Sequence, residues 1–258
     1  MHTGAITSYI DVAQLTLYAF WLFFAGVIYY LHQENKREGY PLVSDRSAHI
    51  SVEGFPPVPA PKTFRLADGH EVQAPRREAP EEVRGVPVGP WPGAPLVPMN
   101  NGMTDAIGPG AYAARADEPD LCFDDHKPKI VPLRVARDFF LATEDPDLIG
   151  WTVLGADGEA AGTVVEAWID RSEVILRYIE VALTAPLAVR TVLLPMPFAA
   201  LSAKTREVHV RAILAAHFAD VPALRDPDSV TLREEDRICA YYAAGTLYAT
   251  PARAEPLL

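Results

Sequence analysis

The chain has 258 residues and a formal net charge of −11, with 34 acidic side chains against 23 lysines and arginines. An acidic balance of this size argues against a nucleic-acid-binding surface, which needs clustered positive charge. The length leaves room for a membrane segment, one sizeable folded domain and irregular segments, but not for two large domains. The only cysteines, Cys122 and Cys239, lie far apart without a CxxC motif. We therefore predict neither a zinc site nor a disulfide framework, and interpret both as packing residues.

The first predicted element is a transmembrane helix over residues 12–32. The run from Val12 to Leu31 is apolar and aromatic and contains no Asp, Glu, Lys, Arg or His. Twenty residues at about 1.5 Å each cover roughly 30 Å, the thickness of the hydrocarbon core of a bilayer. A cleaved signal peptide is the alternative, but no basic residue precedes the run and the run exceeds the usual length of such a region.

The charges that flank this run predict its orientation. Lys36, Arg37 and Arg46 follow it, whereas residues 1–11 contain no Lys or Arg. Because positive charge is retained on the cytoplasmic side, we predict a periplasmic N-terminus over residues 1–11 and a cytoplasmic C-terminal domain. Tyr30, Lys36 and Arg37 would lie at the cytoplasmic interface, where we predict contact with anionic lipid headgroups.

Residues 33–110 are predicted to be an extended, proline-rich segment. Half of the 24 prolines lie between Pro41 and Pro98, and proline excludes long helices and central strands. Large apolar side chains such as Phe55, Phe64 and Trp91 recur in the segment. We therefore expect it to dock along a protein surface rather than to be disordered.

Residues 111–258 are predicted to form a mainly β domain with a C-terminal helix. Short β-like runs follow one another at the spacing typical of small barrels, over residues 130–136, 151–159, 162–170, 173–183, 190–201 and 207–213. An Asp-Gly pair at positions 157 and 158 is typical of a hairpin turn. These features predict a compact antiparallel β-barrel of five or six strands.

The C-terminal helix has a clear start signal. Thr231 and Glu234 have the spacing of a capping box, and Gly245 has a residue type suited to the C′ position that ends a helix. A shorter helix is expected around residues 213–218.

Two acidic groups are candidates for proton chemistry. Asp170 and Glu173 flank a four-residue turn, which would bring their Cα atoms within about 7 Å. Because like charges disfavour joint ionisation, one carboxyl could bind a proton near neutral pH, and Arg177 on the same strand face would balance the pair. A merely solvated surface turn is the alternative.

The second group consists of Asp124, Asp125 and His126. An imidazole beside two carboxylates could be an entry point for protons or a weak site for a divalent metal. Simple solvation of these side chains is again the alternative.

Several motifs occur along the chain in a characteristic order. They are FWLFFAGVIYYL followed by ENKREGYPL, PKTF at 61–64, GPG at 108–110, KIVPLRVA at 129–136, GTVVEAWIDRSE at 162–173 and VTLREEDRICAYYAAGTLYA at 230–249. In this combination the sequence resembles the H-subunit family of the photosynthetic reaction centres of purple bacteria. The resemblance covers essentially the whole chain.

The resemblance implies a non-catalytic subunit whose cytoplasmic part is a PRC barrel, in the inner (intracytoplasmic) membrane of a bacterium. Such a subunit would cap the cytoplasmic face of the L and M subunits, stabilise the complex and conduct protons to the secondary quinone. Bacteriochlorophyll, bacteriopheophytin, quinones, carotenoid and non-haem iron would be held by the partner subunits, and none by this chain alone. A cytochrome subunit and light-harvesting 1 polypeptides are further expected partners.

The resemblance also assigns residues. Glu173 matches the proton-relay glutamate of the family and Asp170 matches the acid that accompanies it. The family carries two histidines just before its KI-x-P motif, whereas this chain has DDHKPKI, so proton capture would rest on His126 alone. A membrane-tethered PRC-barrel adaptor is the alternative function. A hydrolase using Asp170 and Glu173 has no supporting catalytic motif.

Overall fold

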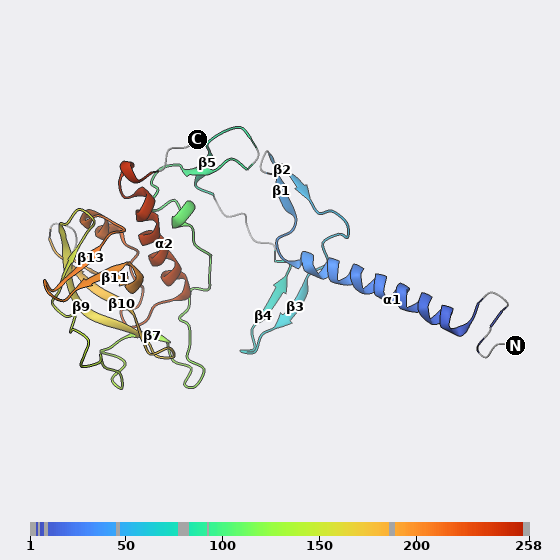
Figure 1. The fold of residues 1–258 in the computed structure, drawn as a ribbon, viewed down its shortest axis with the longest axis horizontal. Coiled ribbons are helices and arrows are strands. Elements are labelled where there is room, and N and C mark those ends of the chain that lie inside the picture. The colour runs from blue at the N-terminus through green and yellow to red at the C-terminus, as the bar shows by residue number, and fades with distance from the viewer. Residues whose placement is uncertain are drawn as a thin grey trace. The chain divides into compact units, whose positions relative to one another are not determined.

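The structure is a computed structural model that describes residues 4, 6–7, 10–44, 47–76, 83–91, 93–185 and 189–254, without the side chains of 43–44 and 47–50. Arg46 and most of the predicted N-terminal segment 1–11 lie outside these residues. The chain divides into two compact units, one of residues 1–82 and 90–93 and the other of residues 83–89 and 94–258. The boundary falls inside the proline-rich segment (Figure 1).

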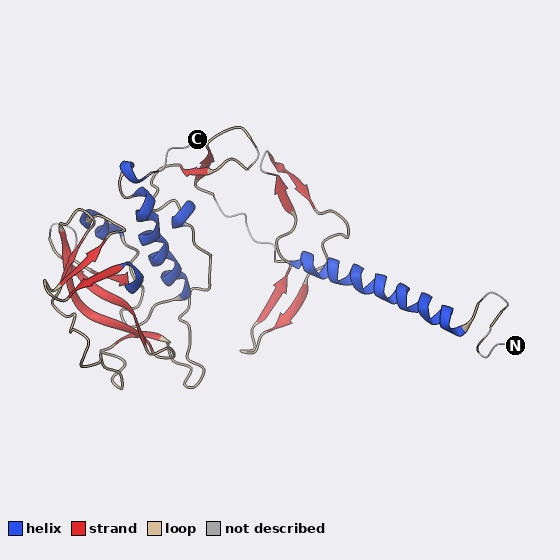
Figure 2. Cartoon of the chain, viewed as in Figure 1, coloured by secondary structure: helices blue, strands red, loops and turns tan. Residues whose placement is uncertain are grey.

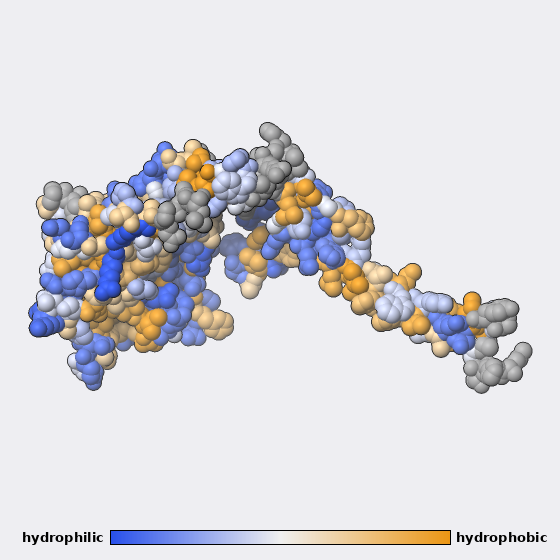
Figure 3. All heavy atoms as spheres, turned by 45° about the horizontal axis from the view of Figure 1, so that its top comes forward, coloured by the Kyte–Doolittle hydropathy of each residue, from blue (hydrophilic) through white to orange (hydrophobic). Residues whose placement is uncertain are grey.

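The first unit begins with helix α1 (Val12–Glu34), which is long and apolar enough to cross a membrane once. Asp11 caps it, because its carboxylate accepts a hydrogen bond from the Gln14 backbone N–H at 2.7 Å. No residue of α1 is buried, and its exposed apolar side chains lie along its length (Figure 3). An apolar surface of this extent needs lipid or another protein to cover it.

The rest of the first unit consists of two hairpins. After the short 3-10 helix Asn35–Arg37, β1 (Leu42–Ser44) pairs with β2 (Ser47–Val52), and β3 (Lys62–Arg65) pairs with β4 (Glu71–Ala74), both antiparallel. The proline-rich segment thus forms short two-stranded pieces, as the restriction on central strands predicts.

The second unit is built on a seven-stranded sheet (Figures 1 and 2). A small hairpin of β5 (Gly85–Pro87) and β6 (Leu96–Pro98) precedes it. The spatial order of the strands in the seven-stranded sheet is β11-β10-β9-β8-β13-β12, with β7 also paired to β9. The strands are β7 (Ile130–Pro132), β8 (Thr152–Leu154), β9 (Ala160–Asp170), β10 (Ile175–Leu183), β11 (Thr191–Pro195), β12 (Ala199–Ser202) and β13 (Glu207–Val210). A mainly β domain followed by a helix is therefore confirmed.

Three details of the sheet differ from the expectation, the first being that it has seven strands instead of five or six. The predicted run 190–201 forms two strands, because Pro197 lies in a 3-10 turn (Met196–Phe198) that separates β11 from β12. The pairing is antiparallel except between β13 and β8, which run parallel. That pair joins distant segments, which a local alternation pattern does not reveal.

Helix α2 (Leu232–Tyr248) covers the core, and its capping box is present as predicted. The placement of Gly245 at the end of the helix is wrong, because α2 continues through it. A Cβ on Gly245 would lie 2.4 Å from Ile213 Cγ2 and 2.5 Å from the Ala212 carbonyl oxygen. The glycine thus permits close packing. The expected helix around 213–218 is a 3-10 helix, Ala215–Asp220.

Strand β10 does not keep the strict alternation that its sequence predicts. The register shifts between Leu176 and Tyr178, which pair with Ile169 and Trp168, so the bulge falls at Arg177. Tyr178 and Ile179 are consequently both buried. The bulge turns Arg177 away from the face predicted for it.

Candidate functional site

The β9–β10 hairpin holds Asp170 and Glu173 as the sequence predicts. Asp170 is the last residue of β9 and pairs with Ile130 of β7 and Ile175 of β10. Its Oδ1 accepts hydrogen bonds from the backbone N–H groups of Ser172 and Glu173, both at 2.9 Å. Asp170 is 1 % exposed, whereas the Glu173 side chain is 54 % exposed. One carboxylate is therefore fixed by the turn, and the other meets solvent.

Lys129 joins these two carboxylates. Its Nζ lies 3.4 Å from Asp170 Oδ2, 3.7 Å from Glu173 Oε1 and 3.8 Å from Asp120 Oδ2. We call these four residues the lysine–carboxylate cluster. Partial burial opposes the charge on Lys129, but its acidic neighbours, Asp170 foremost, outweigh this and raise the pKa of the ammonium. Lys129 takes the balancing role expected of Arg177.

Sequence reasoning missed Lys129 and Asp120 because backbone pairing, not proximity in sequence, brings them to the hairpin. Ile130 pairs with Asp170, and the Arg171 backbone N–H donates to the Lys129 carbonyl at 2.9 Å. Lys129 in turn donates its backbone N–H to the Asp120 carbonyl at 2.8 Å. The available signal was a lysine directly before a predicted strand.

The loop with Asp124, Asp125 and His126 contacts the same hairpin through Arg171. Arg171 forms an ion pair with Asp125 and donates to the Pro128 carbonyl at 3.2 Å. Hydrogen bonds from Arg171, and then from the Lys127 backbone, lower the pKa of Asp125. Asp125 is therefore a fixed anion beside the lysine–carboxylate cluster.

Asp124 and His126 are both exposed. Within the described part of the chain, neither side chain has a hydrogen-bond partner, and no three His, Cys, Asp or Glu side chains gather to hold a metal ion. The metal interpretation of this loop thus has no support from its geometry. An exposed imidazole remains suited to exchange protons with solvent.

Arg177 acts electrostatically on two titratable side chains of α2, Glu235 and Cys239. Burial of Glu235 and Cys239 raises the pKa values of both groups, and the charge of Arg177 lowers them by a smaller amount. Tyr178 donates its hydroxyl to Glu235 Oε2 at 3.1 Å. Asp120 also acts on Glu235, so this group adjoins the lysine–carboxylate cluster electrostatically. Cys122 is buried and Cys239 is partly buried, in agreement with a packing role.

Glu235→Gln is expected to change how stability depends on pH. Burial raises the pKa of Glu235 in the folded state above its ordinary value of 4.5. The native state then binds more protons than the unfolded state, so stability falls as pH rises from that value through the raised pKa. Below pH 4.5 the variant should be as stable as the parent chain. Above the raised pKa it should be more stable, by on the order of 1 kcal/mol, because the side chain of Glu235 keeps some solvent contact.

The measurement is the urea midpoint of the full chain in lipid nanodiscs between pH 4 and 8. Glu144→Gln, at an exposed acid of the same unit, should leave the profile unchanged. Parallel profiles for Glu235→Gln and the parent chain would remove Glu235 as a source of pH dependence.

The predicted lipid-facing group at the end of α1 has partners within its own unit. Lys36 is 6 % exposed, and its ammonium donates to the carbonyls of Glu53 and Pro56. Arg37 donates to the carbonyls of Ala60 and Ala74, both at 2.8 Å. A lipid contact stays a prediction for the exposed ring of Tyr30, but for Lys36 it would require breaking both hydrogen bonds.

Exposed apolar side chains surround the β9–β10 hairpin. Phe140 is 84 % exposed, Val174 69 % and Ile175 44 %. With Leu201 they line a hollow of about 490 Å³. We call these four residues the apolar face. Val174 has φ of 55°, which a β-branched residue rarely adopts, and it places an apolar group at the tip of the turn beside Glu173.

Two family comparisons match different parts of the chain. Residues 4–135 match the N-terminal region of the photosynthetic reaction-centre H chain, and residues 143–216 match the PRC-barrel domain. The chain belongs to the photosynthetic reaction-centre H-chain family. The H chain is thus a membrane-anchored reaction-centre subunit, in agreement with the apolar helix α1. Its lysine–carboxylate cluster takes Asp120 and Lys129 from the first match and Asp170 and Glu173 from the second.

Proposed function

We propose that this H chain caps the cytoplasmic face of the L and M subunits and passes protons toward the secondary quinone. Helix α1 would anchor it in the inner membrane with the N-terminus in the periplasm, because basic residues come after the helix and none comes before it. The L and M subunits would hold the pigments, quinones and iron, and the chain would have no active site of its own. A cytochrome subunit and light-harvesting 1 polypeptides are further proposed partners.

The observation that carries this proposal is the position of the lysine–carboxylate cluster beside the apolar face. An exposed apolar surface of this kind is typical of a protein–protein interface. Docking of a partner there would exclude water from Glu173, whose side chain is 54 % exposed in the isolated chain. A carboxyl that loses water binds a proton more readily, as a relay between solvent and a buried quinone requires.

The neighbours of Glu173 suit such a relay. Lys129 lies within 4 Å of three carboxylates, so its charge can compensate the negative charge that returns when one of them releases a proton. Arg171 links the hairpin to the loop of Asp125, where the exposed His126 and Asp124 would collect protons from solvent. Asp170, held by two backbone N–H groups, would mainly keep the turn in place.

Glu173→Gln tests the relay in the assembled complex. The amide keeps the size of the side chain but cannot carry a proton, so we expect the proton-coupled second electron transfer to the quinone to slow by about tenfold or more. Primary charge separation should be unchanged. Flash absorption spectroscopy of the purified complex follows both steps.

Glu144→Gln serves as the matched control, because Glu144 is an exposed acid outside the cluster. Unaltered second-transfer kinetics in Glu173→Gln would take Glu173 out of the proton path. A separate measurement tests the assembly with the pigment-bearing subunits. If the chain, purified in detergent, came without near-infrared pigment bands, the proposed place in a reaction centre would be overturned, whatever the kinetics of Glu173→Gln.

A further inference from the structure

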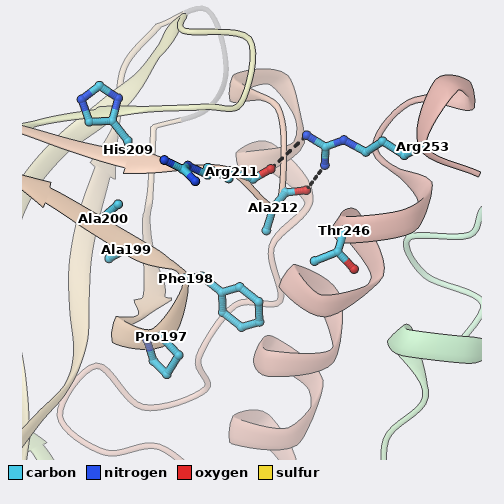
Figure 4. Close-up of a pocket in the computed structure, with 9 residues that line it drawn as sticks. All are labelled: Pro197, Phe198, Ala199, Ala200, His209, Arg211, Ala212, Thr246 and Arg253. Carbon is cyan, nitrogen blue, oxygen red and sulfur yellow. Dashed lines mark hydrogen bonds between the residues drawn. The ribbon is translucent and has the colours of Figure 1, made fainter.

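A second concave surface of the barrel unit shares none of its lining residues with the apolar face. It is a hollow of about 520 Å³ between the strands β12 and β13 and the C-terminal end of α2 (Figure 4). This volume lies within the range of roughly 300–1,000 Å³ that is typical of small-molecule sites. The side chains around it differ sharply in character from one side to the other.

One side of the hollow is apolar and rigid. Pro197 and Phe198 of the 3-10 turn and Ala200 of β12 contribute to it. The Phe198 ring stacks on Tyr242, with ring centroids 5.6 Å apart and an interplanar angle of 24°. Because Tyr242 is fully buried, Phe198 has a fixed support, and it offers a preformed apolar surface to a ligand.

The other side carries positive charge. Arg253 donates to the carbonyls of Ala212 at 2.6 Å, Gly245 at 2.7 Å and Arg211 at 2.9 Å. These bonds fix the guanidinium, as Figure 4 shows for two of them. The three acceptors are uncharged, and among the described residues no carboxylate pairs with Arg253, so its positive charge is not compensated at the rim.

Arg211 adds a second uncompensated cation. Its side chain is exposed, and among the described residues no group accepts a hydrogen bond from its guanidinium and no carboxylate pairs with it. Glu207, the acid at the opposite end of β13, lies 3.2 Å from His209 Nε2 and so pairs with that ring. Two guanidinium groups at one hollow, without a carboxylate partner in the part of the chain that the structure describes, will attract an anion even though the net charge of the chain is −11.

We propose that this hollow binds a single-chain anionic amphiphile, with a phosphate or carboxylate headgroup on Arg211 and the hydrocarbon chain on Phe198 and Pro197. An inorganic anion would gain nothing from the apolar side, and a neutral alkane would gain nothing from the arginines. A chain that α1 anchors in a membrane occurs in a compartment that holds such amphiphiles. The inference is independent of the proton relay, because it uses none of the same residues.

The test uses octyl phosphate as the probe and the full chain in nanodiscs of neutral phosphatidylcholine. Titration calorimetry, corrected with empty nanodiscs, should show saturable binding of one molecule per chain. Arg211→Gln should raise the Kd by about tenfold or more, because it removes a charge-assisted hydrogen bond to the headgroup. Ala200→Phe, at an exposed strand position, should weaken binding similarly by filling the hollow.

Lys204→Gln is the matched control, because Lys204 is an exposed cation of the same hairpin that does not line the hollow. Its affinity should equal that of the parent chain. Four results would overturn the proposal. They are inorganic phosphate binding as tightly as octyl phosphate, octanol binding as tightly as octyl phosphate, an equal loss in Lys204→Gln and Arg211→Gln, and absence of saturation.

Discussion

Gly162→Val is expected to prevent the sheet of the second unit from forming. A Cβ at Gly162 would lie 2.2 Å from the Ala182 carbonyl oxygen and 2.9 Å from Val181 Cγ1. Gly162 pairs with Leu183 of β10 on one side and Val153 of β8 on the other, so neither neighbour can move without breaking a strand pair. We expect a loss of at least about 3 kcal/mol, a large part of the stability of a typical domain.

Ala160→Val is the matched control, since Ala160 is an exposed residue of the same strand. Valine there should change stability by no more than about 0.5 kcal/mol, because it suits a strand and meets solvent. Near-ultraviolet circular dichroism and the urea midpoint of each full chain in nanodiscs separate the two outcomes. A Gly162→Val chain with the parent midpoint would show that the close approach of β9 to β10 is not essential.

The double variant Phe140→Asp, Val174→Asp is expected to abolish association with the partner subunits. Each apolar side chain would contribute roughly 1.5–3 kcal/mol when covered by a partner, and a carboxylate in the same place must instead lose its water. We therefore expect association to weaken at least about a hundredfold. The measurement is the yield of pigment-containing complex that copurifies with the tagged chain.

Misfolding would not explain such a loss. Phe140 and Val174 are 84 % and 69 % exposed, so neither supports the core. Aspartate also tolerates the positive φ of position 174 better than valine does. Val189→Asp, at a fully exposed residue outside the apolar face, should copurify normally. Full recovery of the complex with the double variant would place the interface elsewhere.

The parts of the fold that depend on local signals could be predicted from the sequence. The apolar run of α1, the capping box of Thr231 and Glu234, and the turn between Asp170 and Glu173 each need only a few neighbouring residues. The parts that failed depend on residues distant in sequence. Gly245 has the residue type of a helix end, but it permits contact with Ile213, which no local pattern shows.

The candidate site divides in the same way. The carboxylates of the hairpin could be predicted, but their counter-ion could not. Arg177 has the correct spacing in sequence, yet a bulge redirects it toward Glu235, and Lys129 takes its place through the pairing of β7 with β9. Bulges and strand order are set by packing of the whole sheet, which period-two alternation does not contain.

The hydrogen bonds of Lys36 and Arg37 have a mechanical consequence for the first unit. Both residues directly follow α1, and four backbone carbonyls between Glu53 and Ala74 hold their side chains. The connection between the two hairpins and the end of β4 are thereby tied to the end of the helix, so a rotation of α1 about its own axis would move them as well. A partner that fixes the rotation of the membrane helix would therefore also fix the direction in which the chain between Glu53 and Ala74 leaves it.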